Sequence, residues 1–144
     1  MLLWDMEVPL SKEQKIRIAN SKDIFLIMRQ ILRRENKLAK QQEHFWIVGL
    51  TKSNRILYIE LMGLGGKKFV NVSIKQVLKI AIYKDAESII AVHNHPTGTL
   101  RPSEADEHIT QYLKHGGNFV EIKLKDHLII SEKGYFSFKD KKLL

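Results

Sequence analysis

The chain has 144 residues, 44% of them hydrophobic, which is enough for one globular domain with a buried core. It contains no cysteine, and this excludes disulfide bonds, thiolate zinc sites and thiol catalysis. The formal net charge of +8 would attract nucleic acid or acidic proteins, although many solvated surfaces carry a charge of this size.

No stretch of the sequence is long and apolar enough to span a lipid bilayer. The opening Met1-Leu2-Leu3-Trp4-Asp5 lacks the basic segment and the small-residue cleavage site of a signal peptide. We therefore expect a cytoplasmic protein without membrane contact. Residues 1–20 are weakly patterned and are expected to form an N-terminal arm, followed by one domain over residues 21–144. The sequence does not determine the oligomeric state.

Apolar periodicity and turn residues predict the order of the elements. Helices are expected to begin at Ser21, Ser73 and Ser103, the first carrying apolar residues as far as Leu38. The third is expected to end at Gly116-Gly117 and to bury Ile109, Tyr112 and Leu113. Strands are expected over residues 45–50, 56–62, 69–72, 88–92, 119–124, 128–130 and 135–138. This order predicts an α/β fold in which a mixed sheet is packed between helices.

The segment His93-Asn94-His95-Pro96 follows a predicted strand, and Ser103 and Asp106 follow at the start of the next helix. Because alternate residues of a strand point to the same face, both imidazoles can reach one metal ion. Two imidazoles and a carboxylate are suitable ligands for zinc, and a fourth position remains for water, as in catalytic zinc sites. A His-x-His pair is also a common surface pattern, and Ser103 with Asp106 also matches a helix capping box. The ligand and capping roles of Asp106 are compatible, because a capped helix start is a rigid mount for a ligand.

His93, His95, Pro96, Ser103 and Asp106 together resemble the JAMM motif of the JAB/MPN metalloprotease superfamily. The longer string from His93 to Gly98 resembles the RadC branch of that superfamily. So do Gln42-Glu43-His44-Phe45, Asn54-Arg55, Pro102-Ser103, Asp126-His127-Leu128-Ile129-Ile130 and Gly134-Tyr135, so that the resemblance runs from about residue 22 to residue 139. It implies a single-domain, cytidine-deaminase-like JAB/MPN fold and one Zn²⁺ per chain, held by His93, His95 and Asp106.

The resemblance also implies an upstream glutamate that serves as general base. Glu43 matches best, because it lies between the first helix and the first core strand, and Glu60 is the alternative. Ser103 is implied to hydrogen-bond the oxyanion of the tetrahedral intermediate. Thr97 and His127 are candidates for lining the cleft, and simple packing within a strand is an equal alternative for His127.

The chain departs from the RadC branch in three places. Thr97 stands where serine is usual and keeps a hydroxyl group. Ile74-Lys75 stand where the branch usually has Pro-Arg, which alters a surface contact. We also expect the helical N-terminal region of full-length RadC proteins to be missing, so any role of that region toward DNA does not transfer.

Two other enzyme classes are excluded. The letters His93-Asn94-His95 invite comparison with HNH nucleases, but that motif names residues spread over a ββα unit rather than a tripeptide. The zinc deaminases that share this general fold need a Pro-Cys-x-x-Cys motif, and this chain has no cysteine.

Three hypotheses about function remain. The first is a zinc-dependent JAMM hydrolase that cleaves a peptide or isopeptide bond in an unidentified protein substrate. The second is a DNA-associated accessory protein of DNA repair or mobile elements, with weak, non-specific DNA binding and a mainly structural metal. Its candidate surface is a basic stripe of Arg29, Arg33, Lys37 and Lys40 on the first helix, although such stripes are commonly only solvated. The third is a metal-stabilised interaction module without turnover.

Overall fold

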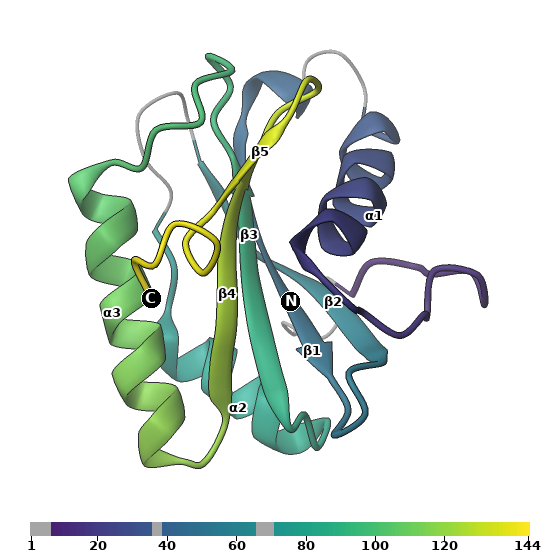
Figure 1. Ribbon diagram of the computed structural model, residues 1–144, viewed down its shortest axis with the longest axis vertical. Coiled ribbons are helices and arrows are strands. Elements are labelled where there is room, and N and C mark those ends of the chain that lie inside the picture. The colour runs from purple at the N-terminus through teal and green to yellow at the C-terminus, as the bar shows by residue number, and fades with distance from the viewer. Residues whose placement is uncertain (1–6, 36–38, 66–70) are drawn as a thin grey trace.

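The computed structural model describes residues 7–35, 39–65 and 71–144. Within them it contains helices α1 (Ser21–Arg33), α2 (Ile74–Tyr83) and α3 (Glu104–Phe119), a short 3-10 turn (Ala39–Gln41), and strands β1 (Glu43–Leu50), β2 (Ile56–Gly65), β3 (Ser88–Asn94), β4 (Lys123–Ile130) and β5 (Tyr135–Ser137). The strands form one sheet in the order β2-β1-β3-β4-β5 (Figure 1). Strands β3 and β4 are parallel and the other neighbours are antiparallel, so the predicted mixed sheet is confirmed.

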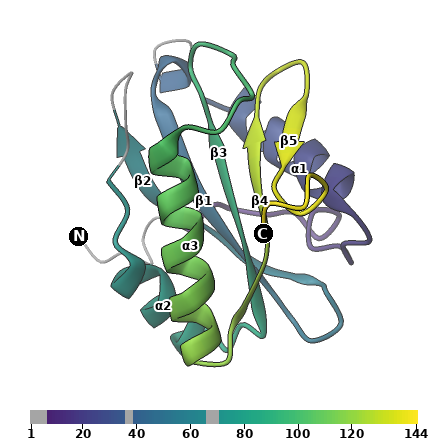
Figure 2. The ribbon, with the colours of Figure 1, turned by 60° about the vertical axis from the view of Figure 1, so that its left-hand side comes forward.

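Helices cover both faces of this sheet. Helix α1 lies on one face, and α2 and α3 lie side by side on the other (Figures 1 and 2). The side chains of the sheet accordingly divide into two cores. In β3, Ile90 and Val92 belong to the core beneath α1, whereas Ile89 and Ala91 belong to the core beneath α2 and α3. The alternation follows from the two-residue period of a strand, and it confirms the predicted α/β class.

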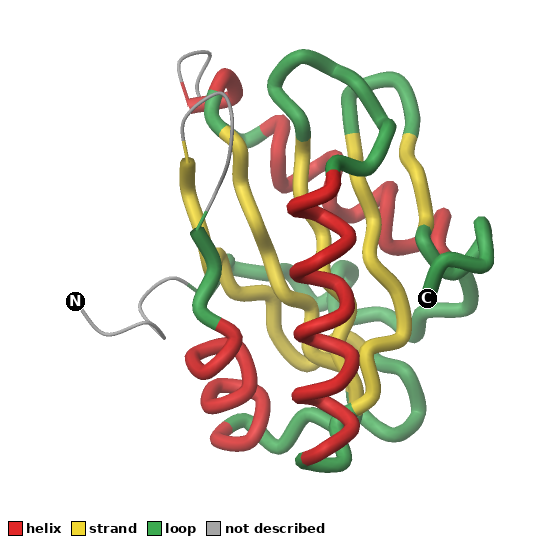
Figure 3. The backbone as a smooth tube through the Cα atoms, turned by 90° about the vertical axis from the view of Figure 1, so that its left-hand side faces the viewer, coloured by secondary structure: helices red, strands yellow, loops and turns green. Residues whose placement is uncertain are grey.

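Strand β3 runs through the centre of the sheet and is buried at every residue. Its final residues lie beside the beginning of β1, because the two strands are antiparallel and Phe45 is paired with His93. The loop after β3 then crosses to the start of α3 at the same end of the sheet (Figure 3). Three segments that are distant in sequence therefore meet at one end of the fold.

Strand β4 is continuous, where two short strands were predicted. A β-bulge interrupts its pairing with β3, because Ile89 is paired with Leu124 and the next residue, Ile90, is paired with Asp126. Lys125 is therefore the additional residue on β4. The predicted strand over 119–124 is wrong for its first residues, since Phe119 is the last residue of α3.

Helix α3 continues past Gly116-Gly117, which were predicted to end it. Gly117 is needed here for close packing and not for a turn. A Cβ atom at this position would lie 2.3 Å from the carbonyl oxygen of Ile122. The predicted buried face of α3 is partly wrong as well. Tyr112 is 64% exposed, and Thr110 is fully buried in its place.

Smaller differences concern the ends of other elements. The cap of α1 is Asn20 and not Ser21, and α1 ends at Arg33, while Leu38 lies outside the described residues. Strand β2 continues to Gly65. Of the strand predicted over 69–72, residues 69–70 lie outside the described residues and 71–72 are not in a strand.

The segment before α1 follows the outer edge of β2. The amide of Val8 donates to the carbonyl oxygen of Ile59, and the amide of Ile18 donates to that of Asn54. Ile18 also packs into the core beneath α1. The division of the chain at residue 20 into an arm and a domain stays a prediction. Among the described residues, no helix has the length and apolarity that crossing a membrane requires.

We expect Gly117→Ala to lower the free energy of unfolding by about 1–3 kcal/mol, because the added methyl group would overlap a backbone oxygen that cannot rotate away. Gly116→Ala is the matched control. Its Cβ would meet side-chain methyl groups of Leu78, at 3.1 Å, and Ile74, at 3.6 Å, rather than backbone, and alanine favours a helix over glycine by about 1 kcal/mol. Urea unfolding of both variants tests this expectation, and equal stabilities would contradict it.

Candidate metal centre

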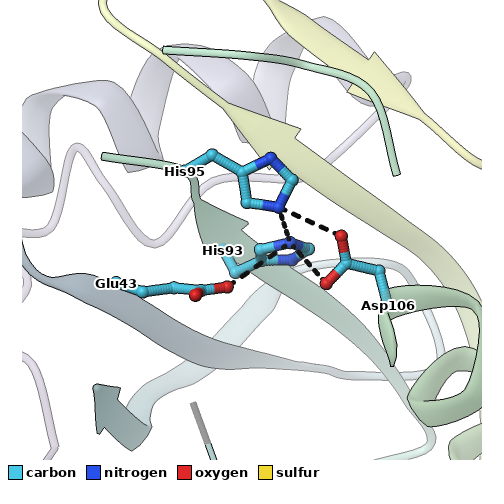
Figure 4. A group of neighbouring side chains, drawn as sticks. All are labelled: Glu43, His93, His95 and Asp106. Atoms are coloured by element: carbon cyan, nitrogen blue, oxygen red, sulfur yellow. Dashed lines mark hydrogen bonds and ion pairs between the residues drawn. The ribbon is translucent and has the colours of Figure 1, made fainter. Parts of the chain in front are cut away.

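Four buried or half-buried side chains meet at the end of the sheet where β1 begins and β3 ends (Figure 4). Glu43 is the first residue of β1, and His93 is the penultimate residue of β3. His95 follows just beyond β3, and Asp106 lies in the first turn of α3. One ligand atom from each residue lies within 4.8 Å of the others.

The two imidazoles and the Asp106 carboxylate are in closest contact. The Nε2 atoms of His93 and His95 are 3.0 Å apart. Asp106 places Oδ1 3.2 Å from His93 Nε2 and Oδ2 3.0 Å from His95 Nε2. Ligand atoms arranged tetrahedrally around zinc are about 3.3 Å apart, given zinc–ligand bonds of about 2.0 Å. The spacing of these donor atoms thus suits a small divalent cation.

The protonation of His95 supports the same assignment. Its Nδ1 lies 3.0 Å from the carbonyl oxygen of Thr99, and a carbonyl oxygen can only accept a hydrogen bond. Nδ1 therefore carries a proton. In the neutral ring, Nε2 then presents a lone pair to His93 Nε2 and to the Asp106 carboxylate. Electron-rich atoms that face one another in this way are a good fit for a cation.

The capping box predicted from Ser103 and Asp106 is present. The Asp106 amide donates to Ser103 Oγ at 3.0 Å, and the Ser103 amide donates to Asp106 Oδ2 at 2.8 Å. The second bond fixes the carboxylate that faces the imidazoles. Capping and orientation of a potential ligand thus coexist in Asp106, as the sequence indicated. Ser103 itself is exposed.

The pKa values of the two carboxyl groups are displaced in opposite directions. Burial works against ionisation of Asp106, but its contacts with the imidazoles of His93 and His95 and the hydrogen bond from the Ser103 amide outweigh it and hold the pKa of this carboxyl well below its usual range. Burial raises the pKa of the Glu43 carboxyl, and the charges of His93 and His95 only partly oppose that rise. Asp106 is therefore suited to remain a charged ligand, and Glu43 is suited to exchange a proton.

Asn94, between the two histidines, holds the beginning of β1 in place. Its Oδ1 accepts from the His44 amide at 2.7 Å, and its Nδ2 donates to the carbonyl oxygen of Gln42 at 3.2 Å. These bonds flank Glu43 on both sides in the chain. They orient the backbone so that Glu43 Oε1 lies 4.0 Å from His93 Nε2. This role of Asn94 was not predicted, although its position between two candidate ligands in the sequence is a usable signal.

Glu60, the alternative general base, does not approach this cluster. It is fully buried on β2, and its Oε1 accepts a hydrogen bond from Lys84 Nζ at 2.7 Å. The same lysine is 2.7 Å from Glu7 Oε1, so Glu60 belongs to a separate ion-pair network. Of the two glutamates, the structure brings Glu43 to the histidines.

The two candidate cleft residues lie in different surroundings. Thr97 is exposed in the loop after β3. His127 is fully buried behind His93, stacked on Phe138 with the ring centroids 4.8 Å apart. Its Nε2 is 2.8 Å from His93 Nδ1, so it packs against the site from within and does not line a cleft. Burial lowers the pKa of His127, which favours its neutral ring.

A small pocket adjoins the site on the side of α1. Its volume is about 220 Å³, and its lining includes His95, Pro96 and Gly98 from the loop after β3, together with Arg33 and Glu132. A group bound at His95 would therefore have space beside it.

Comparison with known proteins places these observations in a family. The family model described as RadC-like JAB domain matches residues 18–143. A UPF0758 protein of Flavobacterium johnsoniae is 38% identical over 124 residues, which cover 86% of this chain and 52% of that protein. A UPF0758 protein of Chlorobaculum tepidum is 34% identical over 134 residues, covering 93% of this chain and 58% of that protein. The chain thus spans about half the length of these relatives, and it belongs to the RadC-like JAB domain family.

Proposed function

We propose that this protein is a zinc-dependent hydrolase of the JAMM type, which cleaves a peptide or isopeptide bond. The observation that carries the proposal is the buried Glu43 carboxylate beside a set of two imidazoles and one carboxylate. Those three ligands, His93, His95 and Asp106, would leave a fourth position of a tetrahedral ion open. The names of the relatives specify no reaction, so the proposal rests on the chemistry of this site and on the JAMM motif.

Zinc bound at this site would supply a Lewis acid that polarises the carbonyl of the scissile bond and lowers the pKa of a water molecule. Glu43 is the residue placed to take a proton from the attacking water, because its carboxylate is buried beside the ligands and its pKa is raised by that burial. The water oxygen forms a bond to the carbonyl carbon, and the carbon–nitrogen bond then breaks. Glu43 returns the proton to the leaving amine, so that it ends the cycle ionised.

Ser103 is placed to assist at the carbonyl oxygen. Its Oγ accepts a hydrogen bond from the Asp106 amide, which leaves the hydroxyl proton free for donation. An exposed position at the start of α3 makes this proton accessible to a bound substrate. A hydrogen bond that strengthens as the oxygen gains charge would accelerate the reaction.

A second candidate is weak, non-specific association with nucleic acid, and a cavity far from the histidines favours it. The cavity has a volume of about 820 Å³ and lies between the end of α3 and the start of β4. Five lysines line it, against two glutamates: Lys114, Lys123, Lys125, Lys139 and Lys142, with Glu87 and Glu121. Burial lowers the pKa of Lys125, and repulsion from Lys123 and Lys139 lowers it further. Closely spaced lysines of this kind suit the sugar–phosphate backbone of nucleic acid.

The basic stripe expected on the first helix is a poorer candidate. Arg33 forms an ion pair with Glu132, and Arg29 donates to the backbone oxygen of the same residue. Lys40 lies in the 3-10 turn rather than on α1, and Lys37 lies outside the described residues. Two of the four positive charges are thus engaged within the molecule.

We expect about one zinc ion per chain after loading, measured by elemental analysis of the desalted protein. His93→Ala or Asp106→Ala should each abolish stoichiometric binding, because two remaining ligands rarely hold zinc against water. His108→Ala, an exposed histidine on the same helix as Asp106, is the control and should bind as the wild type does. Removal of zinc with a chelator should lower the melting temperature without unfolding the chain, since both cores lie outside the site. Undiminished zinc in the two ligand variants would refute the site.

We expect Glu43→Gln to retain zinc and to lower hydrolysis by roughly a hundredfold or more, the usual scale for loss of a general base. The assay is a screen of quenched fluorogenic peptides and isopeptide-linked conjugates with the zinc-loaded protein. Glu104→Gln removes an exposed carboxylate at the start of α3 and should leave the rate unchanged. It is a better control than a change at Glu60, where loss of charge would unbalance a buried ion pair. Equal rates for wild type and Glu43→Gln would contradict the proposed mechanism, and a zinc-loaded protein that cleaves nothing would favour a module without turnover.

We expect any binding of duplex DNA to weaken steeply between about 50 and 200 mM salt, because it would depend on phosphate contacts. Replacing Lys123, Lys139 and Lys142 together with glutamine should reduce affinity more than replacing Arg29 and Arg33. Fluorescence anisotropy with two unrelated duplexes of equal length measures both effects. A tight complex that is selective for one duplex and insensitive to salt would contradict this expectation.

A further inference from the structure

We propose that Thr110 and His127 form a buried hydrogen-bond relay that sets the tautomer of His93 and turns its Nε2 lone pair toward the cation. Both are positioning residues, since neither belongs to the cluster of potential ligands. The inference rests on the proposed metal site and adds to it the two residues that prepare one of its ligands.

The relay begins at the backbone of α3. Thr110 Oγ1 lies 2.7 Å from the carbonyl oxygen of Asp106, four residues earlier in the helix. Because a carbonyl oxygen has no proton, the single hydroxyl proton of Thr110 must be donated there. The hydroxyl of Thr110 can then take part in any other hydrogen bond only as an acceptor.

His127 makes that other bond. Its Nδ1 is 2.6 Å from Thr110 Oγ1, so Nδ1 must carry the proton that is donated to Thr110. His127 is fully buried, and its ring packs against Phe45 and Phe138. The two ring nitrogens contact His93 and Thr110, and neither contacts a carboxylate. Such surroundings favour a neutral ring, because an unpaired buried charge is costly. With its proton on Nδ1, the neutral ring has a lone pair on Nε2.

That lone pair faces His93. His127 Nε2 is 2.8 Å from His93 Nδ1, and both residues are fully buried. A bond between these two nitrogens requires one proton, and it must reside on His93 Nδ1. The neutral ring of His93 then holds its remaining lone pair on Nε2, the atom that faces His95 Nε2 and Asp106 Oδ1.

The relay therefore joins two of the proposed ligands through the interior. It starts at the backbone carbonyl of Asp106 and ends at the ring of His93. His95 obtains the same tautomer by a shorter route, because its Nδ1 donates directly to the Thr99 carbonyl oxygen. Hydrogen bonds of this kind commonly change metal affinity about 10–100-fold when they are removed.

The first test locates the protons in the wild-type protein. Long-range ¹H–¹⁵N correlation spectra of the histidine rings distinguish a proton on Nδ1 from one on Nε2. We expect His127 and His93 to be protonated on Nδ1 in both the metal-free and the zinc-loaded protein. A proton on Nε2 of His127 in the metal-free protein would overturn the relay. This spectrum needs no variant and no activity, so it tests the relay even if the protein binds no zinc, an outcome that would refute the metal site instead.

The second test removes the hydroxyl from the middle of the relay. Thr110→Val keeps the shape of the side chain but can neither donate nor accept, and we expect zinc affinity to fall about 10–100-fold in competition with a chromophoric chelator. Thr110→Ser restores the hydroxyl and should recover most of the affinity. Ser88→Ala is the matched control, because it removes another buried hydroxyl, on β3 itself, that has no hydrogen-bond partner. Wild-type affinity in Thr110→Val, or the same loss in Ser88→Ala, would overturn the proposal.

Discussion

The antiparallel pairing of β1 with β3 is the interaction on which the candidate site depends. It places the first residue of β1 beside the last residues of β3, with Phe45 opposite His93. A slip by one residue would turn every side chain of β1 to the other face, because strands alternate with a period of two. The Asn94 side chain opposes such a slip with two hydrogen bonds at the point where the register matters most. Register, rather than local geometry at Glu43, brings the proposed base to the histidines.

Asp106 connects this end of the sheet to α3, and its roles reinforce one another. The same carboxylate caps the helix, accepts from the Ser103 amide and faces both imidazoles. Its bond from the Ser103 amide fixes the carboxylate at the start of α3, so the helix orients this ligand atom toward the imidazoles.

Much of this organisation could be predicted from sequence, since the signals are local. The ligand spacing at His93 and His95 and the capping pair at Ser103 and Asp106 can be recognised in a few residues. The buried relay could not be predicted in this way, because Thr110 and His127 come together only through the packing of α3 on β4. Gly117 was misinterpreted for the same reason. Glycine is needed at this position because the Ile122 backbone comes close to it. The general tendency of glycine to end helices does not indicate such a contact.

Contacts between residues that are distant in sequence also determine how the basic side chains are arranged. Arg29 and Arg33 have the spacing of a solvated or phosphate-binding stripe, yet Glu132, about a hundred residues later, engages both. The lysines around the large cavity come from α3, β4 and the C-terminal segment, and no local pattern connects them. The net charge thus predicts attraction to anions, but the place on the surface where the positive side chains gather can be determined only from the fold.

The bulge at Lys125 has a consequence for how β4 tolerates change in its length. Before the bulge, Leu124 faces the core beneath α2 and α3, and after it Leu128 faces the core beneath α1, although both numbers are even. The bulge absorbs the extra residue, so that the residues after it keep the alternation set by β3 and His127 points toward Thr110. Deleting Lys125 would leave a regular ladder in which Asp126 follows Leu124, and His127 and Leu128 would keep their faces. Deleting two residues here would instead turn the rest of β4 over, so that the imidazole faced α1. The strand therefore has one residue to spare before His127, and no more.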